Sequence, residues 1–343
     1  QKDAGKACQM YEQAIYFDSK NEQAYLKLAD IYKGANPQQA IEKLEQLKSV
    51  VPSSVLADKK LAEVYYMNNR FDKASEAYAR FIHSSETTED DLVKYAFALF
   101  LNHDFEKSLE VANLGLKRLA MYNYTDMKRY DDAQKAADAF FNAADKADYS
   151  YLDYMYYGHL LNALKKYDEA VMQYQKAIEL DTSKTELWRE ISNAYEQKND
   201  YTDAIVAYQK YYEALPADEQ TADLQFQIGK LYYGKGTQSD TLTVSLDERK
   251  AALVSADSVF AVIAQAAPDS YLGNFWRARA NSALDPETTQ GLAKPYYEEV
   301  AALLVNKNDP RYNSALVECY SYLGYYYLVA NKLPESKEYW NKI

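Results

Sequence analysis

Apolar residues recur along the chain with a helical spacing, and short polar turns interrupt them at regular intervals. In four segments an apolar stripe ends in an aromatic residue or Leu, a polar turn follows, and a second stripe begins with an aromatic residue. Apolar positions at a period near 3.6 residues are typical of amphipathic helices. The pattern therefore predicts pairs of helices joined by short turns. The four segments are KLAEVYYMNNRFDKASEAYARFI (60–82), YAFALFLNHDFEKSLEVANLGL (95–116), YGHLLNALKKYDEAVMQYQKAIELD (157–181) and ISNAYEQKNDYTDAIVAYQKYYEALP (191–216).

Small residues mark a period within these segments. Ala40, Ala74 and Ser108 follow one another at 34-residue intervals, and Ala204 follows Ala170 at the same interval. A period of 34 residues is that of a helix–turn–helix repeat. Small residues allow two helix backbones to approach closely, and large residues fill the gaps between one pair and the next. We expect close approach at Ala62, Ala96, Gly158 and Gly229 in first helices, and gap filling by Tyr65, Leu99, Leu161, Tyr195, Tyr78, Tyr174 and Tyr208.

At this point the sequence resembles the tetratricopeptide repeat family over nearly its whole length. Trp188, Ile191, Tyr195, Ala204, Tyr208 and Pro216 carry the clearest match, and Tyr157, Gly158, Ala170, Tyr174 and Ala177 the next. GLAKPYYEEV is also similar to segments of such proteins from Bacteroidetes-type bacteria. The resemblance implies an all-α, right-handed α-solenoid (superhelix) of about eight to nine helix–turn–helix repeats, whose first helices line a concave wall.

The repeats are expected to form a single array over residues 1–343. Residues 1–20 fit a trailing half-repeat, 22–216 regular repeats, and 221–343 looser repeats with an insertion at about 234–248. The final segment stops inside a second helix, so a C-terminal cap is expected to be lost.

One interval breaks the period, because Ala133 follows Ser108 by only 25 residues. Either two helices fuse around residues 109–125, or a turn is absent from the sequence. We favour the absent turn, because RLAMYNYTDMKRYDDA otherwise reads as an ordinary helix and turn. The polar insertion GTQSDTLTVS is expected to form a protruding turn or short hairpin. Loops on rigid repeats often carry function, and the alternative is a tolerated surface insertion.

The charge of the chain limits its partners. The 39 Lys and Arg residues against 51 Asp and Glu residues give a formal net charge of −12. An acidic chain lacks long-range attraction for phosphate backbones and anionic lipid, so we expect no nucleic-acid partner. No stretch approaches 18 consecutive apolar residues, so no membrane span is expected. The two cysteines, Cys8 and Cys319, lie at opposite ends of the chain, so free thiols are expected.

Few residues point to catalysis. His83, His103 and His159 lie in different repeats, and none has a partner at metal-ligand spacing. His103 in the turn NHD is expected to be solvated or to cap a helix. Nucleophile elbows and Walker loops are absent. We therefore expect no enzyme activity, no metal and no cofactor.

The resemblance places one set of side chains on the concave wall. Such a wall, with aromatic residues beside Lys, Arg and Asn, suits an extended peptide with apolar side chains and some acidic groups. The alternative is that these residues are only solvated lining and that binding occurs elsewhere. The expected wall residues are Lys59, Glu63, Tyr66, Phe97, Phe100, Arg118, Tyr122, Met155, His159, Asn162, Arg189, Asn193, Glu196, Phe226, Lys230 and Tyr233.

Some tetratricopeptide repeat domains clamp a peptide's C-terminal carboxylate with a Lys/Asn/Arg set. Arg189 and Asn193 match two members of that set, with Arg in place of Lys. Gln227 stands where the family has Asn, so the full clamp is not present.

Two functions remain open. The first is a non-catalytic scaffold that binds a peptide segment or a partner subunit in the concave groove. The second is a structural subunit of a bacterial cell-envelope or secretion assembly, held by convex-face and end contacts. An N-terminal Gln and the Bacteroidetes-like segment favour the periplasm or cell envelope over the cytoplasm. The sequence determines neither the partner nor the oligomeric state.

Overall fold

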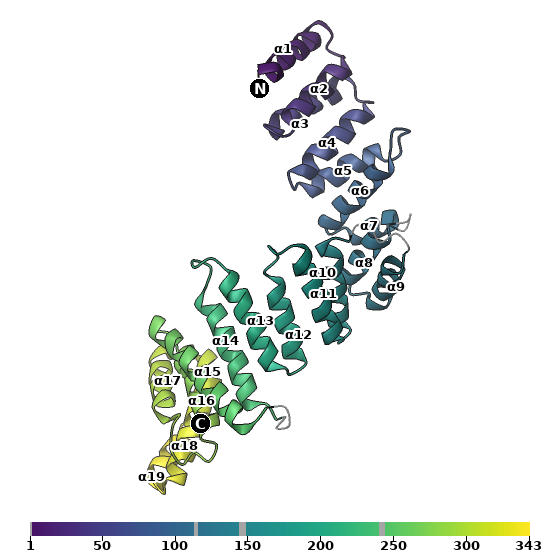
Figure 1. The fold of residues 1–343 in the computed structure, drawn as a ribbon. Helices are drawn as coiled ribbons and strands as arrows, with labels where there is room; N and C mark the ends of the chain where they lie inside the picture. Colours follow the sequence, from purple (N-terminus) through teal and green to yellow (C-terminus); the bar gives the residue numbers. More distant parts are fainter. Residues whose placement is uncertain (1, 113–115, 144–148, 240–243) are drawn as a thin grey trace. The chain divides into compact units, whose positions relative to one another are not determined.

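The chain folds into α-helices that follow one another in pairs (Figure 1). The computed structural model describes residues 2–112, 116–143, 149–239 and 244–343. These residues form 19 α-helices and one short 3-10 helix, with no strand among them. The predicted all-α solenoid of helix pairs is confirmed. From α2 to α19 the helices form nine consecutive pairs, and α1 packs against α2.

Residues Gln1–Tyr149 form one compact unit and Ser150–Ile343 a second. The single array over residues 1–343 stays a prediction. The helices of the first unit are α1 (Lys2–Phe17), α2 (Glu22–Tyr32), α3 (Pro37–Val50), α4 (Val55–Met67), α5 (Phe71–Phe81), α6 (Glu89–Leu101), α7 (Phe105–Ala112), α8 (Lys117–Asp126) and α9 (Tyr130–Phe141).

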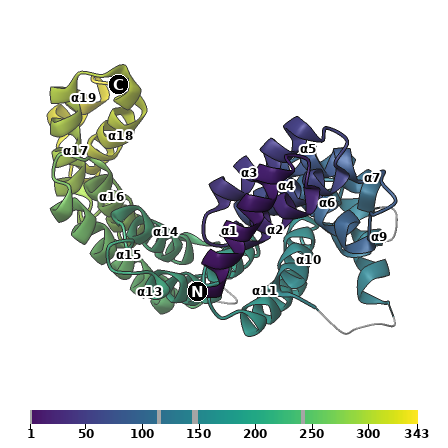
Figure 2. The same ribbon diagram turned by 90° about the horizontal axis from the view of Figure 1, so that it is seen from above.

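In the second unit the first helix of each pair lies on one side and the second helix on the other. Figure 2 shows α14, α16 and α18 along the inner side of a curve, and α13, α15 and α17 along its outer side. The helices of this unit are α10 (Tyr151–Ala163), α11 (Tyr167–Leu180), α12 (Leu187–Gln197), α13 (Tyr201–Ala214), α14 (Ala222–Thr237), α15 (Leu246–Ala266), α16 (Leu272–Leu284), α17 (Lys294–Lys307), the 3-10 helix η1 (Pro310–Tyr312), α18 (Asn313–Val329) and α19 (Leu333–Trp340).

The short turn inside a pair has one recurring backbone geometry. Its central residue adopts a left-handed conformation, and the next residue donates its N–H to a carbonyl five residues earlier, as Lys166 does to Leu161 at 2.8 Å. This bond satisfies a carbonyl that the helix end leaves free. His103 is one of the left-handed residues, which agrees with its expected place in a turn. The others in this position are Asn69, Lys128, Lys165, Asn199 and Asn331.

The periodic small residues lie in the packed interior of the helix pairs. All five that carry the 34-residue period are fully buried: Ala40, Ala74, Ser108, Ala170 and Ala204. Three serines at such positions add a bond across the pair, and the hydroxyl of Ser336 donates to the Gly324 carbonyl at 2.8 Å. The hydroxyl of Ser108 donates to the Ala96 carbonyl at 2.8 Å, and that of Ser192 donates to the Ala204 carbonyl at 2.7 Å. The predicted use of these residues in packing is confirmed.

The irregular interval after Ser108 spans α7 and α8. Leu116, directly before α8, has a non-helical backbone with a φ of −85° and a ψ of 67°, so the fusion of two helices around residues 109–125 is wrong. The favoured alternative, a turn absent from the sequence, stays a prediction, and residues 113–115 lie outside the described residues.

The insertion near residues 234–248 lengthens two helices. Helix α14 continues to Thr237 and α15 begins at Leu246, so these helices have 16 and 21 residues. The capping box of Ser245 and Glu248 starts α15 early, because each side chain bonds the backbone N–H of the other. The loop is therefore shorter than the insertion predicted from sequence, and its residues 240–243 lie outside the described residues.

Candidate functional site

In the first unit, Lys59 and Tyr66 of the expected wall interact with the protein itself. The Lys59 ammonium lies 2.7 Å from a carboxylate oxygen of Asp91 and 5.1 Å from the ring centre of Phe81. Tyr66 makes an edge contact with Phe71, and Glu63 is half-buried. Lys59 therefore joins its helix pair to the next one, and Tyr66 packs within its own pair.

Aromatic residues further along the first unit pack into its interior. Phe100 and Tyr122 are buried, with 7% and 1% of their surfaces exposed. The ring of Tyr122 contacts both Phe100 and Phe97. Phe97 is half-buried, and the guanidinium of Arg118 lies 5.2 Å from the ring centre of Phe140. Phe100 and Tyr122 leave little surface for a partner, because aromatic packing of α6 against α8 covers them.

In the second unit, α10 presents Met155, His159 and Asn162 as half-buried residues. The His159 ring stacks near Tyr156 and makes an edge contact with the buried Tyr174. This imidazole is placed by aromatic neighbours from both helices of its own pair.

The next two first helices form a pocket with three of the expected wall residues. Arg189, Asn193 and Glu196 of α12 line a hollow of about 270 Å³, together with Gln227 of α14. Gln227 is the residue that stands in place of the family's Asn. Tyr208 and Leu231 also line this pocket. The sequence analysis assigned Tyr208 to helix packing and did not single out Leu231.

The side chains of this pocket offer distinct interactions. The Arg189 guanidinium is held 5.6 Å from the ring centre of Tyr211, and Arg189 and Glu196 are exposed. Asn193 is half-buried and Gln227 exposed. Burial raises the pKa of Tyr208, so its phenol remains protonated near neutral pH. The pocket thus joins a cation, two amides, one carboxylate and a small apolar floor.

The remaining expected wall residues lie on α14. Phe226 and Tyr233 are half-buried and contact the ring of Trp276 on α16, at centre distances of 5.6 and 5.3 Å. Lys230 is exposed. Sequence reasoning missed Trp276, although a tryptophan in an apolar helix stripe was a signal for it.

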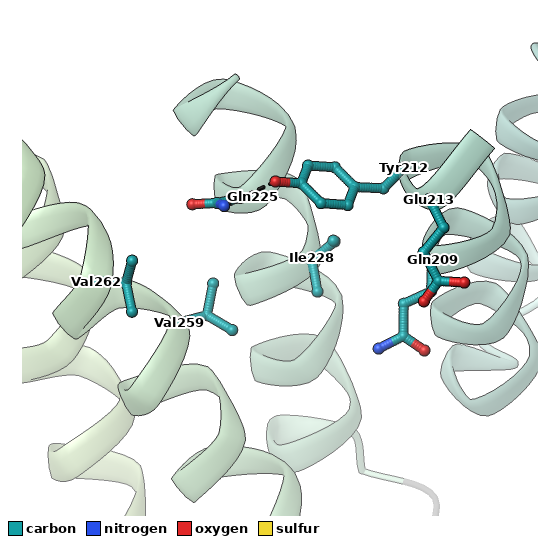
Figure 3. A pocket seen from close by; sticks show the side chains of 7 residues that line it. All are labelled: Gln209, Tyr212, Glu213, Gln225, Ile228, Val259 and Val262. Carbon is teal, nitrogen blue, oxygen red and sulfur yellow. Dashed lines mark hydrogen bonds between the residues drawn. The ribbon is translucent and has the colours of Figure 1, made fainter. Parts of the chain in front are cut away.

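A second pocket opens on the other side of α14 and was not expected from sequence. It has a volume of about 330 Å³ and lies between α13, α14 and α15 (Figure 3). Its walls are Gln209, Tyr212, Glu213, Gln225, Ile228, Val259 and Val262. The side-chain amide of Gln225 donates a 2.8 Å hydrogen bond to the Tyr212 hydroxyl at one edge.

No group of three or more His, Cys, Asp or Glu residues that could hold a metal occurs in the described ranges. Both Cys8 and Cys319 are free thiols, as expected. Among the residues that the structure places, no helix is long and apolar enough to cross a membrane.

The comparisons with known proteins agree with the repeat architecture. Residues 23–54 match the family model of the tetratricopeptide repeat. The C-terminal part of a TPR repeat-containing protein from Cytophaga hutchinsonii has 24% identity and a TM-score of 0.52, covering 82% of this chain and 92% of its own. A tetratricopeptide repeat protein from Parabacteroides merdae has 16% identity and a TM-score of 0.47, covering 73% of this chain and 93% of its own. No curated protein matches the sequence. The chain contains a tetratricopeptide repeat, and its fold is that of an array of such repeats.

Proposed function

We propose that this chain is a non-catalytic protein-interaction scaffold, and that the inner face of α12 and α14 binds an extended peptide segment of its partner. The observation that carries the proposal is the pocket in which Arg189, Asn193 and Gln227 meet across two repeats. Tetratricopeptide repeats are generally interaction modules, and a rigid helical surface positions such side chains well.

The pocket chemistry selects the kind of peptide. The exposed Arg189 suits a carboxylate, because guanidinium can donate two parallel hydrogen bonds to it. Asn193 and Gln227 can donate to and accept from peptide groups on either side. Glu196 disfavours a second acidic group at the other end of the pocket. We therefore propose a peptide with one carboxylate, from an acidic side chain or the C-terminus, next to an apolar residue that contacts Leu231.

The test uses fluorescein-labelled peptides of varied sequence, each made with a free and with an amidated C-terminus, and fluorescence anisotropy as the readout. Arg189→Ala should weaken binding of the best peptide by about 10- to 100-fold, the loss of a hydrogen bond to a charged group. Asn193→Ala should weaken it by about 2- to 10-fold, the loss of a hydrogen bond to a neutral peptide group. Helicity and melting temperature should change little, because Arg189 is exposed and Asn193 is only half-buried.

The matched control is Arg311→Ala, which removes an equally charged but 81% exposed side chain that pairs with Asp309. It should bind like the wild type. The proposal would be contradicted if the Arg189→Ala variant bound every peptide as tightly as the wild type does. The envelope or secretion subunit held by outer-face contacts would then be the better hypothesis, and it stays a prediction, as does a periplasmic location.

A further inference from the structure

The junction between successive helix pairs has the same construction in several places along the chain. A second helix, the following first helix and the next second helix enclose a hollow on the outer side. Two positions determine which side chains fill this hollow. One lies four residues before the small residue of the first helix. The other lies six residues after the small residue of the second helix that follows it.

At two junctions these positions hold interacting side chains. Between α11, α12 and α13 they are Trp188 and Lys210, and the Lys210 ammonium lies 4.2 Å from the centre of the Trp188 ring. Between α3, α4 and α5 they are Asp58 and Arg80, which form a 2.8 Å ion pair. The ion pair does not fill its junction, because Asp58 and Arg80 line a polar hollow of about 370 Å³ there, whereas Lys210 packs directly on the Trp188 ring at the other junction.

The junction between α13, α14 and α15 has neither an aromatic ring nor a charged side chain at these two positions. Counting from Gly229 and Ala256, the two positions hold Gln225 and Val262. Gln225 is shorter than tryptophan, and Val262 is 55% exposed. The space left is the 330 Å³ pocket, with Ile228, Val259 and Val262 as its apolar walls (Figure 3).

The border of this pocket is acidic. Glu213 lines it, and the segment 213–223 that connects α13 to α14 carries Glu213, Asp218, Glu219 and Asp223 without a single Lys or Arg. Glu213 forms no ion pair within the described part of the chain. An apolar pocket beside uncompensated carboxylates favours an aromatic or aliphatic group that arrives with a cation.

We propose that this pocket binds the tryptophan side chain of a partner peptide that has Lys or Arg next to it. The neighbouring junction supplies the argument, because Trp188 and Lys210 occupy there the places that Gln225 and Val262 leave open. An indole would pack on Ile228 and Val259, and the adjacent basic group would face Glu213 and the acidic segment. The site lies on the outer side of α14 and is separate from the peptide site proposed for the inner face.

The experiment is methyl NMR of the full chain labelled at Ile, Leu and Val, titrated with the peptide acetyl-Gly-Lys-Trp-Lys-Gly-amide. The methyl signals of Ile228, Val259 and Val262 should shift in a saturable way. Peptides with Ala in place of Trp, or Glu in place of both Lys residues, should bind about tenfold or more weakly. Equal binding of all three peptides would overturn the proposal.

Two variants test the location. Gln225→Trp should fill the pocket from within, and Val262→Lys should close it as Lys210 closes its own junction, so each should reduce binding at least about tenfold. Arg189→Ala is the matched control and should bind this peptide normally, which separates this site from the inner-face site. Unchanged binding by the folded pocket variants would overturn the proposal. So would shifts of the same methyl groups with protein concentration alone, because a second copy of the chain would then be the occupant.

Discussion

Gly158 lies directly against the ring of Tyr174. A Cβ atom on Gly158 would be 2.6 Å from Cε1 of that ring, which is closer than two carbon atoms approach without repulsion. The same relationship joins Gly229 to Phe260 and Gly324 to Trp340, at 2.6 and 2.8 Å. The small residue of the first helix is therefore matched to a large ring on the second helix of its own pair.

Gly158→Ala should destabilise the second unit by about 1–3 kcal/mol, because the fully buried Tyr174 has no free space to move into. Equilibrium unfolding in urea measures the effect. Gly5→Ala on α1 is the control, since a Cβ there meets nothing within 4 Å. It should be neutral or stabilise by up to about 1 kcal/mol. A Gly158→Ala protein as stable as the wild type would show that the ring relaxes freely.

Lys165→Gly should stabilise the turn between α10 and α11. Lys165 has a φ of 61°, and the left-handed region costs a non-glycine residue about 1 kcal/mol. The thermal midpoint of the second unit should therefore rise. Gln175→Gly makes the matched change on an exposed face inside α11, where glycine should cost about 1 kcal/mol. A lowered midpoint for Lys165→Gly would contradict the role of the left-handed turn.

The buried Asp91 should contribute stability that acid removes. Burial raises the pKa of this carboxyl, but hydrogen bonds from Lys59 and Thr88 outweigh it, so its pKa lies below the ordinary value of 3.8. Because the pKa of Asp91 is lower in the folded than in the unfolded protein, its ionised carboxylate stabilises the fold at pH values above the unfolded pKa. This stability is lost as the pH falls through the pKa of the folded state.

Asp91→Asn should therefore lower stability near neutral pH by about 1–3 kcal/mol and flatten the pH dependence below pH 3.8. Unfolding in urea at several pH values measures both effects. The adjacent Asp90→Asn is the control, because Asp90 pairs with Lys94 at the surface and should change stability by less than about 1 kcal/mol. An unaltered pH profile for Asp91→Asn would refute the assignment.

The two cysteines should differ in reactivity. Burial, and then the charge of Glu318, raise the pKa of the fully buried Cys319 to about 12, so it holds almost no thiolate. Cys8 on α1 is only partly buried. With a thiol reagent at about pH 8, the native protein should react quickly at one thiol and the denatured protein at two. Cys8→Ser should abolish the native reaction, and fast modification of Cys319 would show that α18 opens readily.

The sequence by itself determined the repeat and its packing. Small residues such as Ala170 and Ala204 stand at a fixed period because two helix backbones must approach closely there, and any larger residue would separate them. The turn between paired helices was readable for the same reason, since its length and polarity recur. These features depend on contacts within one repeat, which local spacing encodes.

Only the tertiary structure decided which side chains remain available to a partner. Phe100 and Tyr122 stand at expected wall positions, yet aromatic contacts between α6 and α8 bury them. Three helices together form the hollow beside Gln225, and its size depends on the space that Gln225 and Val262 leave unfilled. Such features arise from the volumes of side chains that are distant in sequence, and a periodic pattern carries no measure of that volume.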